Sequence, residues 1–195
     1  TKRSAVWGQQ TKRSAVWGQQ TKRSAVWGLL LLAICLTQMP VRAQSVYVSA
    51  TSGDDANSGF SWETAKQTLP AALAVLVDST TGAGSGDIYV KAGDYSISTE
   101  LVIPAGVTLR GGYRQSATGT DTILRRLPGV NAHWTDNTWC TIISGDGFHR
   151  IATVRGLIDG CVVRNGFTST IGGGLLLDGG TARYCVVKEC DAIND

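Results

Sequence analysis

Short segments in which apolar and polar residues alternate recur along the chain after residue 44. The sequences SVYVSA (45–50), DIYVKAGDY (87–95) and GVTLRGGY (106–113) carry apolar residues at alternating positions. A period of two places such residues on one face of a strand. Glycine, asparagine and aspartate gather between the segments, as they do in turns. The pattern therefore predicts many short strands, each with one buried face, joined by tight turns.

A helical period appears in one stretch of this region, residues 62–76. Apolar residues there, including Leu69 and Leu73, fall at helical spacing on one face. Ser61 precedes the stretch and is a suitable N-terminal cap. Pro70 interrupts the pattern. The sequence therefore predicts either a helix that kinks at Pro70 or a short turn followed by a helix that begins near it.

Three later segments repeat one motif, a cysteine followed by β-branched residues and a corner. They are CTIISG (140–145), CVVRNG (161–166) and CVVKEC (185–190), at offsets of 21 and 24 residues, and segments 87–95 and 106–113 superpose at an offset of 19. Offsets of roughly 20–24 residues, with one short strand in each unit, predict the rungs of a parallel β-helix. In such a fold, equivalent residues stack about 4.8 Å apart.

Strand alternation within this motif predicts a structural ladder inside the solenoid. The ladder consists of the three cysteines and the β-branched residue two positions after each one: Cys140, Cys161, Cys185, Ile142, Val163 and Val187. Buried thiols pack as small hydrophobic groups. We favour this interpretation over disulfide bonds, for which the sequence indicates no pairing. Arg164 and Lys188 are then expected to point outward.

Residues 114–139 interrupt the repeat and are predicted to form an excursion from the solenoid. The stretch contains Trp134 and Trp139. Their rings either stack on the sugar rings of a ligand or shield the side of the solenoid. These two tryptophans are the candidate ligand-binding residues.

The N-terminal region has the pattern of an export signal. The basic unit TKRSAVWGQQ occurs twice in full and once in part, followed by the apolar run LLLLAICL (29–36) and by Val41, Arg42 and Ala43. A basic segment, a short apolar core and a small-residue cleavage site are typical of a secretory signal peptide. The apolar run is far shorter than the ~18–20 residues that span a bilayer. No transmembrane segment is therefore expected in the mature chain.

The charge balance changes sign once this signal is set aside. From Gln44 onward the chain has 11 Lys and Arg residues against 15 Asp and Glu, a net charge of −4, whereas the whole chain carries +3. An acidic chain is not suited to bind nucleic acid, and no such partner is expected. The glycines at 172–174 lack the lysine of a phosphate loop, so no nucleotide cofactor is expected either.

Taken in order, YVSATSGDDANSGF, GDIYVKAGDY, GVTLRGGY, LIDGCVVRNG and GGGLLLDGG resemble the N-terminal part of a known class of proteins. These are exported bacterial right-handed parallel β-helix repeat proteins, the pectin-lyase-like solenoids of Bacteroidetes-type surface proteins. The resemblance implies an all-β fold with three parts. These are a signal peptide at 1–43, an N-terminal strand and capping helix at 44–86, and β-helix rungs at 87–195 that are incomplete at the C-terminus.

The resemblance implies one of two functions. We favour a secreted or cell-surface protein, extracellular or on the outer membrane, that acts in adhesion, carbohydrate contact or surface architecture. Its partners would be polysaccharides or host and cell-surface glycans, with no catalysis in this chain, no cofactor and no metal. The alternative is a pectin-lyase-like polysaccharide lyase or glycoside hydrolase, with its active site in further C-terminal rungs and calcium as its cofactor in the lyase case.

Candidate catalytic residues for this alternative combine carboxylates with cations. A lyase needs carboxylates that hold calcium and a basic side chain that takes up a proton, whereas a hydrolase needs a pair of carboxyl groups. The candidates are Asp159, Asp178, Arg164 and Lys188. Each aspartate also lies beside a glycine or a turn, where aspartate is common for structural reasons.

Overall fold

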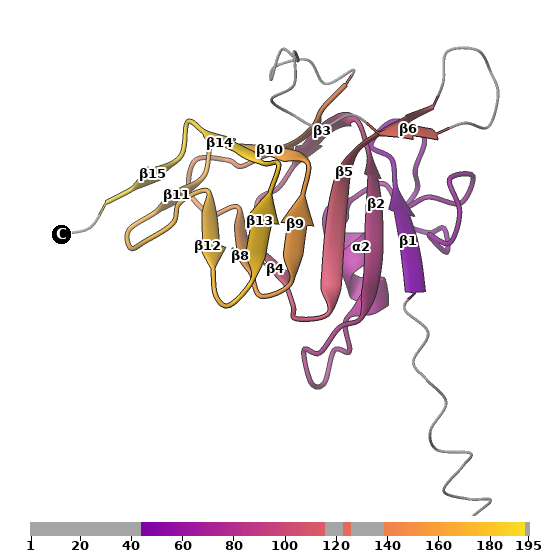
Figure 1. Ribbon diagram of the computed structural model, residues 1–195, viewed down its shortest axis with the longest axis horizontal. Helices are drawn as coiled ribbons and strands as arrows, with labels where there is room; N and C mark the ends of the chain where they lie inside the picture. The colour runs from indigo at the N-terminus through magenta and orange to yellow at the C-terminus, as the bar shows by residue number, and fades with distance from the viewer. Residues whose placement is uncertain (1–43, 116–122, 126–138, 194–195) are drawn as a thin grey trace, which may run out of the picture. The chain divides into compact units, whose positions relative to one another are not determined.

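The computed structural model describes residues 44–115, 123–125 and 139–193 (Figure 1). They form many short strands and one short helix, which confirms the predicted all-β class. The residues of the predicted signal peptide lie outside the described part. The elements are β1 (Gln44–Val48), α2 (Leu69–Leu76), β2 (Gly86–Lys91), β3 (Gly93–Ser96), β4 (Leu101–Ile103), β5 (Val107–Gln115), β6 (Ile123–Arg125), β7 (Thr141–Ser144), β8 (Ala152–Val154), β9 (Leu157–Asp159), β10 (Cys161–Arg164), β11 (Phe167–Thr168), β12 (Leu175–Leu177), β13 (Thr181–Arg183), β14 (Val186–Lys188) and β15 (Asp191–Ala192).

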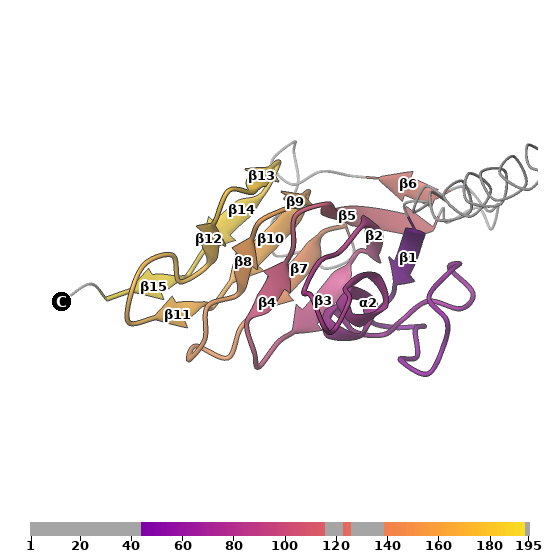
Figure 2. The same cartoon turned by 90° about the horizontal axis from the view of Figure 1, so that it is seen from below.

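The chain distributes most of these strands over three parallel sheets in a repeating order. The first sheet has the order β1-β2-β5-β9-β13, the second β3-β7-β10-β14 and the third β4-β8-β12, and β11 pairs with β15. Successive strands such as β2, β3 and β4 therefore belong to different sheets, and each pairs with its equivalent in a later turn of the chain (Figures 1 and 2). Strand β6 is the exception among the described strands, because it pairs antiparallel with β5.

Alternation along the strands places one row of side chains inside. In the first sheet, Val46, Ile88, Leu109 and Ile158 are neighbours in register, and all four are fully buried. Burial alternates along β2 with the predicted period of two. Stacking of equivalent apolar residues on parallel strands thus builds one continuous core.

Helix α2 is shorter than a helix over all of residues 62–76, the first of the two predicted alternatives. It begins at Leu69, with Thr68 as the N-cap and Pro70 in the first turn, so the second alternative is confirmed and a start at Ser61 is wrong. The reason lies in the preceding loop. The carboxylate of Asp55 accepts hydrogen bonds from the backbone N–H groups of Gln67 and Thr68 and from the Thr68 hydroxyl, at 2.8–2.9 Å.

The same loop covers the outer edge of β1. Tyr47 donates its N–H to the carbonyl of Gly59 at 2.8 Å and accepts a hydrogen bond from the N–H of Lys66 at 2.9 Å. Helix α2 packs against β1, β2 and β4. Backbone groups that would otherwise form an open sheet edge are therefore satisfied at this end.

The register of the first two superposed segments differs from the prediction. Ile88 pairs with Leu109 and not with Val107, and Lys91 pairs with Tyr113 after an irregularity in the pairing. A slip of two residues leaves the same side chains on the same face. The predicted inward and outward positions of β2 are therefore right although the offset of 19 residues is wrong.

The predicted ladder is wrong at Cys140 and Ile142. Strand β10 pairs Cys161 with Thr141, so Cys140 lies one residue outside the column. A slip of one residue moves side chains to the opposite face. Cys140 and Ile142 accordingly pack with Val162 in a separate cluster.

The part of the ladder that β10 and β14 form has the predicted register. Val162 pairs with Val186 and Val163 with Val187, which brings Cys161 and Cys185 to equivalent positions. Cys161 and Val163 are fully buried in the main core, whereas Val187 is 49% exposed.

One buried hydroxyl joins two turns of the chain. Tyr95, only 4% exposed, donates its hydroxyl to the carbonyl of Lys91 at 3.0 Å and accepts a hydrogen bond from the N–H of Ala50 at 3.2 Å. Burial raises the pKa of this phenol well above its usual value, so the hydroxyl keeps its proton.

Replacing Tyr95 by phenylalanine is expected to lower the free energy of unfolding by about 1–3 kcal/mol, because two backbone groups lose a buried partner. Urea denaturation followed by circular dichroism measures the change. The matched control is Tyr184→Phe, since Tyr184 is 61% exposed. Equal effects of the two substitutions would contradict the role given to the Tyr95 hydroxyl.

The hydrogen bonds that Asp55 accepts from Gln67 and Thr68 predict that the stability of the protein depends on pH. Partial burial alone raises the pKa of Asp55, but hydrogen bonds from Thr68 and Gln67, with the charge of Lys66, outweigh it and lower the pKa. A lowered pKa in the folded state gives stability that is complete above the ordinary pKa of about 3.9 and is lost as the pH falls through the lowered value. Asp55→Asn should therefore reduce the urea midpoint more at about pH 6 than at about pH 3. A reduction that is equal at both pH values would show that the charged carboxylate is not the stabilising form.

Candidate functional site

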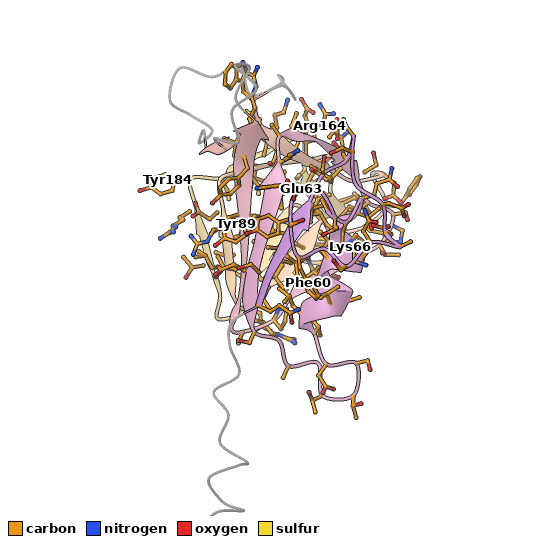
Figure 3. All side chains as sticks on the ribbon, turned by 90° about the vertical axis from the view of Figure 1, so that its right-hand side faces the viewer. Phe60, Glu63, Lys66, Tyr89, Arg164 and Tyr184 are labelled. Atoms are coloured by element: carbon orange, nitrogen blue, oxygen red, sulfur yellow. The ribbon has the colours of Figure 1, made fainter. Side chains whose placement is uncertain are left out.

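The outward face of the first sheet carries a continuous row of large side chains. Strand pairing aligns Tyr47 of β1, Tyr89 of β2, Arg110 of β5, Asp159 of β9 and Arg183 of β13. These residues alternate with the buried row of the core, so their side chains stand on the opposite face. Figure 3 shows Tyr89 on the outer side of these strands.

Four rings form what we call the aromatic cluster: Tyr47, Trp62, Tyr89 and Tyr113. Tyr47 stacks on Tyr89 with ring centroids 5.3 Å apart and an interplanar angle of 21°, and meets Trp62 edge-on at 4.8 Å. Tyr113 contacts Tyr89 edge-on at 5.3 Å and Trp62 at 6.0 Å. Each ring is half-buried, so part of each ring remains accessible to solvent.

A cation accompanies the aromatic cluster. The ammonium of Lys91 lies 5.3 Å from the centroid of the Trp62 ring, within the range of a cation–π interaction. Lys91 is on the strand of Tyr89 and pairs with Tyr113 on the neighbouring strand. Trp62 comes from the loop between β1 and α2 and is thereby held over the sheet.

The rest of the row consists of alternating charges. The guanidinium of Arg110 lies 3.2 Å from the carboxylate of Asp87 and 3.6 Å from that of Asp159, which also accepts a hydrogen bond from Arg183 at 2.9 Å. The hydrogen bond and charge of Asp159 raise the pKa of Arg183. The side chain of Asp159 is completely buried, whereas that of Arg183 is 48% exposed.

The predicted catalytic candidates come from three sheets. Asp159 is buried in the first sheet, Arg164 and Lys188 are neighbours in register on the second, and Asp178 follows β12 of the third. Asp178 forms an exposed ion pair with Arg155 at 2.8 Å. The structure thus brings Arg164 and Lys188 together but does not join them to either candidate carboxylate.

Arg164 has a different carboxylate beside it. Its guanidinium contacts Asp94 at 2.5 Å and the hydroxyl of Ser144 at 2.8 Å, and this hydroxyl lies 2.8 Å from the other oxygen of Asp94. All three groups bind one another across strands β3, β7 and β10. The side chain of Arg164 is 26% exposed, and two of its nitrogens are engaged in a structural network.

Of the two candidate ligand-binding tryptophans, the structure describes Trp139. The guanidinium carbon of Arg114 lies 3.8 Å from the centroid of the Trp139 ring, so one ring face is covered by the protein's own cation. Trp139 also packs against the cluster that contains Cys140 and Ile142. Trp134 lies outside the described residues.

An open depression of about 310 Å³ lies beside the second sheet, lined by three carboxylates and a phenylalanine: Asp146, Glu189, Asp191 and Phe167. Asp146 accepts hydrogen bonds from the N–H of Phe148 at 2.9 Å and lies 3.0 Å from a ring nitrogen of His149. Within the described residues, no three His, Cys, Asp or Glu side chains are placed to hold a metal ion.

Comparisons with family models, curated proteins and solved structures gave no match. The fold and the geometry of the outward face therefore carry the functional argument. The described part of the chain contains no helix with the length and hydrophobicity needed to cross a lipid bilayer.

The aromatic cluster was missed by the sequence analysis, although part of its signal was present. Tyr47 and Tyr89 each stand between two valines or between isoleucine and valine in an alternating strand, which predicts outward tyrosines. Tyr113 gave no such signal, because two glycines interrupt the alternation before it. Trp62 precedes helix α2, as the second predicted alternative has it, and its helical spacing carried no signal that the ring lies over the sheet.

Asp159 is expected to act through charge pairing inside the protein. Replacing it by asparagine leaves two guanidinium groups short of a buried partner and should lower the free energy of unfolding by about 3–5 kcal/mol. The matched control is Asp178→Asn, because the exposed ion pair of Asp178 with Arg155 should contribute at most about 1 kcal/mol to stability. Thermal and urea denaturation of both variants measure this contrast, and a larger loss in the Asp178 variant would refute it.

Proposed function

We propose that this chain forms turns of a right-handed parallel β-helix and that it acts outside the cell, as a secreted or surface protein. The repeating order of three parallel sheets supports the solenoid. The contacts of helix α2 with β1, β2 and β4 support a capping role, because a solenoid end needs its strand edges and core covered. The predicted signal peptide at 1–43 supports export.

We further propose that the outward face of the first sheet binds carbohydrate, as part of adhesion or surface architecture. The observation that carries this proposal is the aromatic cluster on a regular sheet. Aromatic rings are flat, rigid and only half-buried here, so the apolar C–H faces of a sugar can pack on them. Side chains of Asp87, Arg110 and Arg183 continue along the same face and can bond sugar hydroxyls.

The geometry favours binding over catalysis on this face. The single carboxylate in the row that was a catalytic candidate, Asp159, is buried between two arginines. A glycoside hydrolase needs two carboxyl groups that both reach the substrate. The partners of this face are therefore proposed to be polysaccharides or cell-surface glycans that are held and not cleaved.

Replacing Tyr89 by alanine is expected to weaken glycan binding by about tenfold or more, because aromatic residues at the centre of an interface carry much of its binding energy. Tyr89 contacts two other rings of the aromatic cluster, so its loss removes the middle of the platform. Affinity electrophoresis of the purified chain in gels that contain soluble plant, algal and mucin-type glycans measures the change.

The matched control is Phe148→Ala, because Phe148 is 78% exposed in the turn after β7 and lies outside the aromatic cluster. This variant should bind like the unchanged protein. Equal binding by the Tyr89 and Phe148 variants would remove the basis for the proposed face. Shortened glycan chains after incubation with the protein would instead favour the enzyme.

A further inference from the structure

We propose that Thr141, a buried residue of the second sheet, is a positioning residue for the aromatic cluster on the first sheet. The inference rests on the proposed function of that face, because it explains how Tyr113 is brought into the platform. It concerns a side chain that is fully buried and that touches no ligand itself.

The first step is the irregular pairing of β2 with β5. Tyr89 pairs with Arg110, but Lys91 pairs with Tyr113, so β5 contains one more residue than β2 between the two pairs. This is a β-bulge. In regular alternation Tyr113 would share the inward face with Leu109, whereas the extra residue turns it outward, where it contacts Tyr89 and Trp62.

The second step is the pair of glycines that permits the bulge. Gly112 has a φ of +81°, which side-chain-bearing residues rarely adopt. A Cβ atom on Gly111 would lie 2.7 Å from the sulfur of Cys161 and 2.9 Å from the Cβ of Thr141. Glycines allow this conformation, but their flexibility means that they do not by themselves select it.

The third step is the hydroxyl that selects it. Thr141 accepts a hydrogen bond from the N–H of Gly112 at 2.8 Å and donates its proton toward the carbonyl of Lys91 at 3.0 Å. One side chain of β7 therefore binds both β2 and β5 at the bulge. A buried N–H without a partner is unfavourable, so loss of this hydroxyl should let β5 shift and Tyr113 leave its place in the cluster.

The test combines a spectroscopic reading of the cluster with glycan binding. The full chain is labelled with 5-fluorotryptophan, and the fluorine resonance of Trp62 is assigned through its absence in Trp62→Phe. Thr141→Val keeps the shape of the side chain and removes the hydroxyl. We expect it to shift or broaden the Trp62 resonance and to weaken glycan binding by roughly tenfold, the loss expected when one ring leaves the aromatic cluster.

Two further variants separate positioning from general destabilisation. Thr141→Ser retains a hydroxyl and should restore both the resonance and the affinity. Thr153→Val removes another buried hydroxyl, from a residue of the third sheet that bonds Glu100 just before β4. It should leave the Trp62 resonance and glycan binding unchanged even if it lowers the unfolding midpoint.

An unchanged Trp62 resonance in Thr141→Val would overturn the inference, and so would an equal shift in Thr153→Val. If Thr141→Val does not fold, the comparison of Thr141→Ser with Gly112→Ala decides, because only the glycine variant should displace the resonance. If the unchanged protein binds no glycan while the resonance still responds to Thr141, the proposed function fails and the positioning role of Thr141 stands.

Discussion

Backbone pairing between parallel strands of successive turns is the constraint on which the rest of this structure depends. A strand that pairs with its equivalent in the next turn must place each side chain above its counterpart, at a spacing of about 4.8 Å. The corners repeat as well. Gly160 and Tyr184, after β9 and β13, both have positive φ, as do Asn165 and Glu189 after β10 and β14. Strand and corner positions are thus passed from one turn to the next.

This constraint produces rows of unlike chemistry on the two faces of one sheet. The inward row repeats Val46, Ile88 and Leu109, because any polar residue there would lack partners. The outward row is more accessible, except at the buried Asp159, and changes from tyrosines in the first turns to an alternation of arginine and aspartate in the later ones. An extended polymer lying along such a row would meet ring surfaces first and hydrogen-bonding groups afterwards.

The strand alternation could be predicted because apolar residues recur with a period of two. The equivalence of Cys161 and Cys185 could be predicted because each cysteine is followed by two valines and then a basic residue. The prediction failed at Cys140 because Thr141, Ile142 and Ile143 are all β-branched, so a slip of one residue leaves the pattern equally apolar. Helical spacing could not decide between the two helix starts, near Ser61 and near Pro70, since it carries no information on the hydrogen bonds of Asp55. The place of Tyr113 in the aromatic cluster depends on a bulge, and a bulge changes the alternation from which faces are inferred.

The carbonyl of Lys91 shows how the core and the outward face are coupled. It accepts hydrogen bonds from Tyr95 and from Thr141, at 3.0 Å each, while the side chain of the same residue lies over Trp62. The backbone at this point is therefore fixed from the inside, where no water competes for the carbonyl, and the cation on the outside follows. A sheet with a purely apolar interior could stack equally well, but it would lack the hydroxyl that binds the N–H of Gly112 at the bulge. Buried hydroxyls thus favour one arrangement of the outward rings, in addition to what they contribute to stability.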